Sequence, residues 1–304
     1  MTAIFVAFLP MQIYISQFIS NEVFASLSIS LALYWLIRLI SENTYRVRDS
    51  LLLGLTLGLA YLSKYTGLLI VLTAGYVYLV IMLRKKAQRK KMVFSLLTCM
   101  SVVLLMAGPF YLRNYVRGGR FFHTNQSVTL EYRDLNFLIN PFNIGTGVLD
   151  KFVSRSVSFV DGNYSSMWLD QSRKTYPWTR VFDSVIYYLA IFPTFLLVVG
   201  FFRALALCNA DGEESRRYLP ILVFIGFGLF SYVYFVFRYY SYEIVKAFYM
   251  LSQITGLAVF FVLGLKQISR NPVSSSVFLY TGFVLYLAIV SYYLLAPILI
   301  GKLS

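Results

Sequence analysis

The chain has 304 residues, of which 59% are hydrophobic, 18% aromatic and only 13% charged, and its mean hydropathy is +0.69. This balance excludes a soluble globular protein and predicts an all-α polytopic membrane protein. The formal charge is +14, but the basic residues lie in short loops between apolar segments. They therefore indicate orientation in the membrane and argue against nucleic-acid binding.

The cysteine and histidine content limits the metal and redox chemistry. The chain contains two cysteines far apart, Cys99 and Cys208, and a single histidine. These numbers exclude a disulfide framework and a metal centre built from His and Cys side chains. A divalent cation held by carboxylates is left open as the one candidate cofactor.

The amino-terminal residues begin the membrane region. Residues 1–9 are apolar but too short to cross a bilayer, so we expect them to be the second half of a spanning helix. Residues 10–22 are predicted to form a segment on the outer face. Residues 23–40 then return through the membrane to a basic inner loop.

Residues 51–83 form a long apolar stretch with one internal charge, Lys64. As a single helix the stretch would measure about 50 Å, whereas the hydrocarbon core is about 30 Å thick. We therefore predict a helical hairpin that turns at residues 63–66. Basic loops precede and follow the stretch, and such loops stay on the cytoplasmic side. Lys64 is thus predicted at the hairpin tip, on the extracytoplasmic face. Gly54 and Gly58 are spaced for close helix packing.

The rest of the chain divides around one long polar segment. A span at 92–107 is predicted to end at Pro109, and residues 115–181 to form an extracytoplasmic loop region with short or interfacial helices. Two glycosylation-type triplets, at Asn125 and Asn163, fall in this loop. We predict three regions: transmembrane helices in 1–114, the loop in 115–181, and further transmembrane helices in 182–304, with spans at 183–202, 218–237, 247–265 and 277–298.

Polar side chains from separate span ends are predicted to meet at the outer face. A cavity there, lined by cations and a few carboxylates, suits a substrate with a lipid tail and a phosphate head, because cations neutralise phosphate and a carboxylate accepts a proton. The side chains are Gln12, Ser16, Gln17, Asn21, Glu22, Lys64, Arg113, Asn114, Arg238, Tyr242, Glu243 and Lys246.

Four sequence motifs, in their order along the chain, resemble those of the GT-C glycosyltransferases. This family includes protein O-mannosyltransferases and lipid A aminoarabinose transferases. The resemblance extends from about residue 10 to about residue 265. It rests on Pro10 to Ser16 followed by Asn21-Glu22, on the glycine-rich helix that ends in Ser63-Lys64, on Gly108 to Asn114, and on Lys246-Ala247-Phe248-Tyr249, where Phe248 replaces the usual Arg.

The resemblance implies a GT-C-like helical bundle with one long extracytoplasmic loop. It further implies inverting transfer of a sugar from a polyprenyl-phosphate donor to a lipid, glycan or protein acceptor at that face. Family members carry their principal catalytic acid in the first outer loop after a first span. We therefore expect that this chain lacks that acid or that Glu22 serves as the catalytic carboxylate. The donor phosphate would be bound by Lys64, Arg113, Lys246 and Tyr249, and the cavity would also be lined by Asn21, Asn114, Arg238 and Tyr242.

Each of these residues also has a structural explanation. Glu22 can stabilise the start of a helix through the helix dipole, and Lys64 can extend to the membrane interface. Arg113 can be an interfacial anchor, and Arg238 with Tyr242 can belong to an aromatic and basic belt.

Two other functions are left open by the sequence. One is a secondary transporter, because a broken hairpin with a charge also occurs on substrate pathways. The other is a non-catalytic subunit of cell-envelope polysaccharide assembly or export. Membrane lipids surround the chain under every alternative.

Overall fold

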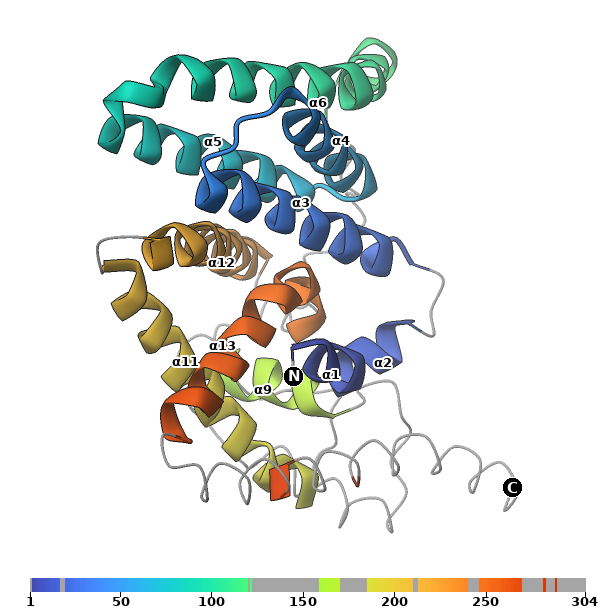
Figure 1. The fold of residues 1–304 in the computed structure, drawn as a ribbon. Coiled ribbons are helices and arrows are strands. Elements are labelled where there is room, and N and C mark those ends of the chain that lie inside the picture. The colour runs from blue at the N-terminus through green and yellow to red at the C-terminus, as the bar shows by residue number, and fades with distance from the viewer. Residues whose placement is uncertain are drawn as a thin grey trace.

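A computed structural model describes residues 2–16, 20–119, 121, 159–169, 185–209, 213–239 and 246–269, together with 281, 282 and 288. All regular elements in these ranges are helical, and six helices are long and apolar enough to cross a membrane (Figure 1). The chain is therefore an all-α, multi-pass integral membrane protein, as its composition predicts. The span expected at 277–298 lies almost entirely outside the described residues.

The amino terminus forms two short helices, α1 (Thr2–Phe8) and α2 (Pro10–Ser16). Both bury apolar side chains, including Phe5 and Met11, in the same core as α13 (Ile254–Ile268). The Phe5 ring stacks on Phe261 of α13 at 4.7 Å between ring centroids. The structure describes two packed helices of seven residues each, and the assignment of residues 1–9 to the second half of a spanning helix stays a prediction.

The first span is α3 (Glu22–Glu42), whose 21 residues rise about 31 Å and so match the hydrocarbon core. It is followed by α4 (Val47–Ser63) and α5 (Gly67–Arg84), which form the predicted hairpin. Gly67 is required at the turn, because a Cβ there would lie 2.0 Å from the carbonyl oxygen of Ala60. The hairpin is confirmed, with its turn at residues 64–66.

A short 3-10 helix, η1 (Lys86–Gln88), leads into α6 (Arg89–Gly118), which packs on α4. The predicted close packing at Gly54 is confirmed, because a Cβ there would lie 2.8 Å from the Cys99 carbonyl oxygen. The prediction that Pro109 ends this span is wrong, since α6 continues through it to Gly118. Gly118 thus ends the helix, four residues into the segment predicted as a loop, and Gly119 caps it with φ of 66°. A proline removes one backbone hydrogen bond, which spanning helices tolerate through local adjustment.

The second half contains α9 (Phe159–Trp168), α11 (Ile191–Asn209), α12 (Glu213–Tyr239), η4 (Ala247–Gln253) and α13. Helices α11 and α13 cross in close contact, because a Cβ on Gly200 would lie 1.7 Å from the Phe260 carbonyl oxygen. Helix α12 lies between the two halves in Figure 1. It contributes Phe224 to the core of α3–α6, and Ile221 to the core of the second half.

The hairpin separates the loops of the first half into two ends. At one end the Lys85 ammonium donates a hydrogen bond to Asn43 Oδ1 at 2.6 Å, so the α3–α4 and α5–η1 connections meet there. At the other end Asn21 Nδ2 donates to the Ser63 carbonyl oxygen at 2.7 Å. We name these the basic end, after residues 84–91 (Arg84 to Lys91), and the tip end, after the hairpin tip.

Candidate functional site

Glu22 and Lys64 form an ion pair at the tip end, although 42 positions separate them in the sequence. Glu22 is the first residue of α3, and Lys64 is the C-cap residue that follows α4. The exposed fraction is 13% for the Glu22 side chain and 18% for Lys64. Two charges that are this well shielded interact more strongly than a surface pair. The sequence predicted the donor phosphate as the partner of Lys64. In the structure, the partner of Lys64 is the carboxylate of Glu22.

The backbone around the pair fixes both side chains. Lys64 is extended, with φ of −158° and ψ of 148°, and its N–H donates to the Ala60 carbonyl oxygen. The Gly67 N–H in turn donates to the Lys64 carbonyl oxygen at 2.8 Å and starts α5. Asn21, the N-cap residue of α3, binds the Ser63 carbonyl oxygen instead of capping its own helix. The start of α3 is thus joined to the hairpin tip at two consecutive residues.

Aromatic side chains support the hairpin tip from α6. The Tyr111 hydroxyl donates to the Tyr61 carbonyl oxygen at 3.0 Å, and the two rings stack with centroids 4.5 Å apart. Tyr65 lies beside them, with its ring centroid 6.5 Å from that of Tyr111. Arg113 and Asn114 follow on α6, with Arg113 exposed and Asn114 half-buried. The third motif is therefore attached to the same tip, through Tyr111.

Lys246 begins η4, next to the polar helix α9. The Ala247 N–H donates to Ser166 Oγ at 2.6 Å, and η4 contacts α2, α3 and α9. Tyr249 stacks with Phe248 at 4.3 Å between ring centroids, so its ring is part of an aromatic cluster. The fourth motif thus lies against the elements that flank the α2–α3 junction.

Helix α9 contains polar residues whose buried contacts the sequence did not predict. Asp161 is buried and accepts a hydrogen bond of 2.5 Å from the Tyr187 hydroxyl. Burial raises the pKa of the Asp161 carboxyl, and the bond from Tyr187 opposes that rise. Asn163 accepts from the Tyr232 hydroxyl at 2.7 Å and lies inside the helix. Its triplet therefore serves packing in this structure. A polar run between two loop segments was the only signal in the sequence.

The other cations predicted for the site, Arg113, Arg238 and Lys246, form no hydrogen bond or ion pair with the Glu22–Lys64 pair in the part of the chain that the structure describes. Arg238 is exposed near the end of α12, and Tyr242 lies outside the described residues. The structure brings together Asn21, Glu22 and Lys64.

The described residues contain no group of three or more His, Cys, Asp or Glu side chains able to hold a metal ion. Glu22 is a carboxylate that the structure describes at the tip end. Its contact with Lys64 uses Oε1 and leaves Oε2 outside the ion pair.

Comparison with known families independently supports the resemblance for the first part of the chain. Residues 1–110 match the family model of dolichyl-phosphate-mannose-protein mannosyltransferases. No curated protein and no solved structure matches the chain. The matched segment contains the α2–α3 junction, the hairpin and most of α6, and hence both members of the ion pair. The resemblance to the GT-C family is therefore supported over residues 1–110, about a third of the chain.

Proposed function

We propose that the chain transfers a sugar from a polyprenyl-phosphate donor to an acceptor at the extracytoplasmic face, and that the tip end is where the donor binds. The observation that carries this proposal is the Glu22–Lys64 ion pair, because it joins two of the family-like motifs in one place. A lipid-linked donor reaches such a site from the membrane, with its phosphate at the interface and its tail among the exposed apolar side chains.

The reaction follows from the charges at the tip end. An acceptor hydroxyl attacks the anomeric carbon, the bond from that carbon to the phosphate oxygen breaks, and the bonding electrons leave with the lipid phosphate. The phosphate needs no proton because it is a stable anion at neutral pH. The Glu22 carboxylate would accept the acceptor's proton, a role that requires hydrogen-bond reach to the hydroxyl.

Lys64 would contact both Glu22 and the donor phosphate. An ammonium group has three N–H donors, and the ion pair occupies one direction only. A phosphate oxygen would thus bind Lys64 without displacing Glu22, and it would hold the reacting sugar beside the carboxylate. Arg113 would add charge on the phosphate side from α6, with the planar geometry that suits phosphate oxygens.

Transfer in detergent from a radiolabelled polyprenyl-phosphate sugar tests the proposal. We expect E22Q to reduce the rate at least a hundredfold, because it removes a general base. The matched control is E42Q, which neutralises an exposed carboxylate at the basic end. K64A should raise the KM for the donor, with K86A as its control. Repeating the assay with a chelator tests the divalent cation.

The other two functions give different results in the same preparation. Uptake of the donor into sealed liposomes without formation of labelled product would support a transporter and overturn the transferase proposal. Neither transfer nor uptake, from protein that elutes as a single folded species, would favour a non-catalytic subunit.

A further inference from the structure

A pocket of about 260 Å³ opens at the basic end, between the last two turns of α3 and the start of α12. Its walls include Arg38 and Arg217, and the one carboxylate in its lining is Glu42. The described lining of the pocket thus includes two guanidinium groups and one carboxylate. The pocket lies at the opposite end of α3 from Glu22, so it does not belong to the proposed donor site.

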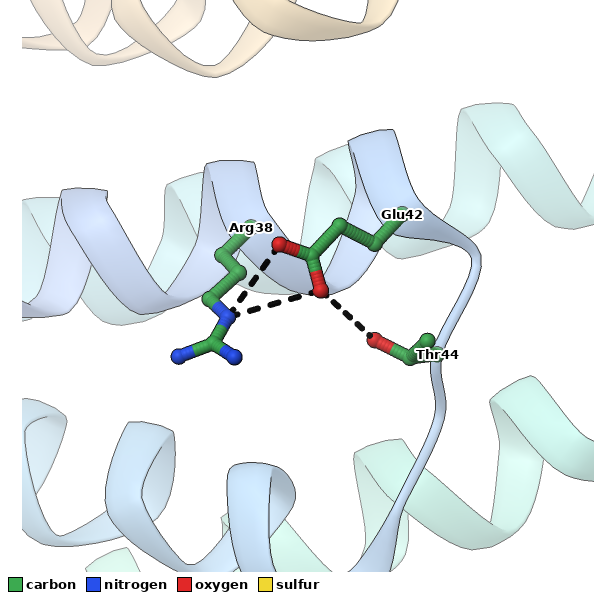
Figure 2. A network of polar contacts seen from close by, with 3 residues as sticks. All are labelled: Arg38, Glu42 and Thr44. Atoms are coloured by element: carbon green, nitrogen blue, oxygen red, sulfur yellow. Dashed lines mark hydrogen bonds and ion pairs between the residues drawn. The ribbon is translucent and has the colours of Figure 1, made fainter.

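Arg38 is held so that one edge of its guanidinium group does not face Glu42. Only Nε approaches that carboxylate, at 3.3 and 3.4 Å from its two oxygens. Figure 2 shows both Nη atoms pointing away from it, while the other carboxylate contact is a hydrogen bond from Thr44. The guanidinium carbon lies 5.2 Å from the centroid of the Trp35 ring, which supports its plane. Such an edge matches the spacing of phosphate oxygens.

Two more cations lie at the neighbouring α3–α4 connection. Burial lowers the pKa of Lys85, and the positive charge of Arg216 lowers it further. Lys85 and Arg216 form no ion pair with any carboxylate among the described residues. Charges of like sign that are this close are stabilised when an anion lies near both.

Two buried hydroxyl groups in the same region lack a hydrogen-bond partner within the described part of the chain. They are Ser41 Oγ, in the lining of the pocket, and the hydroxyl of Tyr45, on the connection itself. An unbonded buried hydroxyl is unfavourable, and an acceptor placed near it would remove that cost. Arg216 also acts electrostatically on the Tyr45 hydroxyl.

The surface of α3 beside the pocket indicates what kind of anion binds. Leu27, Leu31 and Tyr34 are 54%, 43% and 53% exposed and follow one another at helical spacing. They form an apolar stripe that runs from the pocket, of which Tyr34 is part, toward the middle of the membrane. An acyl chain would lie along this stripe, whereas a soluble anion would make no use of it.

We propose that the basic end binds the phosphate of an anionic phospholipid in the adjacent leaflet, through Arg38, Lys85, Arg216 and Arg217 together with the hydroxyls of Ser41 and Tyr45. The lipid tail lies on the stripe of Leu27, Leu31 and Tyr34. Binding places an anion beside cations that separate segments contribute, and it offers an acceptor to Ser41 Oγ, which lies in the pocket lining. Basic pockets between spanning helices bind anionic headgroups by this chemistry in general.

Lipid binding to the purified full chain in detergent tests the proposal, with phosphatidylglycerol and phosphatidylcholine as probes and thermal unfolding and native mass spectrometry as readouts. We expect phosphatidylglycerol to raise Tm and to remain bound, and phosphatidylcholine to do neither. R216Q and K85Q should each weaken phosphatidylglycerol binding roughly fivefold. R48Q is the matched control, because Arg48 is an exposed cation at the same end.

Tyr45→Phe separates lipid binding from folding. The tyrosine hydroxyl has no partner in the described chain, so the substitution should leave Tm in phosphatidylcholine unchanged while weakening phosphatidylglycerol binding. Equal effects of R216Q, K85Q and R48Q would overturn the proposal in favour of general surface attraction. An equal rise in Tm with inorganic phosphate would overturn the lipid assignment.

Discussion

The Glu22–Lys64 ion pair predicts a measurable coupling between α3 and the hairpin. Changing Lys64 to Met keeps the length of the side chain and removes its charge, which leaves Glu22 at 13% exposure without its partner. Glu22→Gln does the converse, and the double variant removes both charges. Because the pair is shielded but not fully buried, each single change should cost about 2 kcal/mol, between the values for exposed and for fully buried pairs.

The coupling is obtained from a double-mutant cycle on the free energy of unfolding, measured with a membrane-compatible method such as steric trapping in bicelles. We expect a coupling of about 1 to 2 kcal/mol, since the double variant should be nearly as stable as either single one. The pair Arg38–Glu42 is the internal control, with exposed fractions of 38% and 51% and a spacing of one helical turn (Figure 2). Its coupling should be below about 0.5 kcal/mol. Equal couplings for the two pairs would refute the reasoning.

Three further predictions concern the structure around the site. Gly67→Ala should lower the free energy of unfolding by about 3 kcal/mol or prevent folding, because the new Cβ would lie 2.0 Å from the Ala60 carbonyl oxygen. Gly75→Ala is the control: no atom lies within 4 Å of its Cβ, so the free energy of unfolding should change by less than about 1 kcal/mol. Tyr111→Phe removes the 3.0 Å hydrogen bond to the Tyr61 carbonyl oxygen and should cost about 1 kcal/mol in the same unfolding assay; no change would mean that ring stacking alone holds the tip. For Asp161, the folded pKa lies above the ordinary 3.8, so the folded state binds more protons and stability falls as pH rises through that window; D161N should flatten this pH dependence of Tm, and an unchanged slope would contradict it.

The hairpin could be predicted from the sequence because length and flanking charge act locally. A stretch too long for one span, with basic residues at both ends, has few alternatives in a bilayer. The spacing of Gly54 and Gly58 likewise predicted which face of α4 packs against another helix. The fold class followed from composition alone.

The ion pair itself could not be predicted, because it depends on how α3 packs against the hairpin. The sequence placed Glu22 and Lys64 on the same face of the membrane, but not in contact. Pro109 was predicted to end a helix because proline interrupts helices in water. In lipid, an unsatisfied backbone group is costly, so α6 keeps its remaining hydrogen bonds and continues through Pro109. The buried polar contacts of α9 could not be predicted, since the polar run in the sequence does not show that Asp161 and Asn163 meet tyrosines from later helices.

The proposed donor site requires the Glu22–Lys64 pair to lie at the membrane face opposite the basic loop of residues 84–91. Single cysteines at Tyr65 and Lys86, both exposed, report the two ends in a background in which Cys99 and Cys208 are replaced by Ser. With a membrane-impermeant maleimide, we expect position 65 to be labelled in intact cells and position 86 only after permeabilisation. Labelling of both positions from the same compartment would contradict the account.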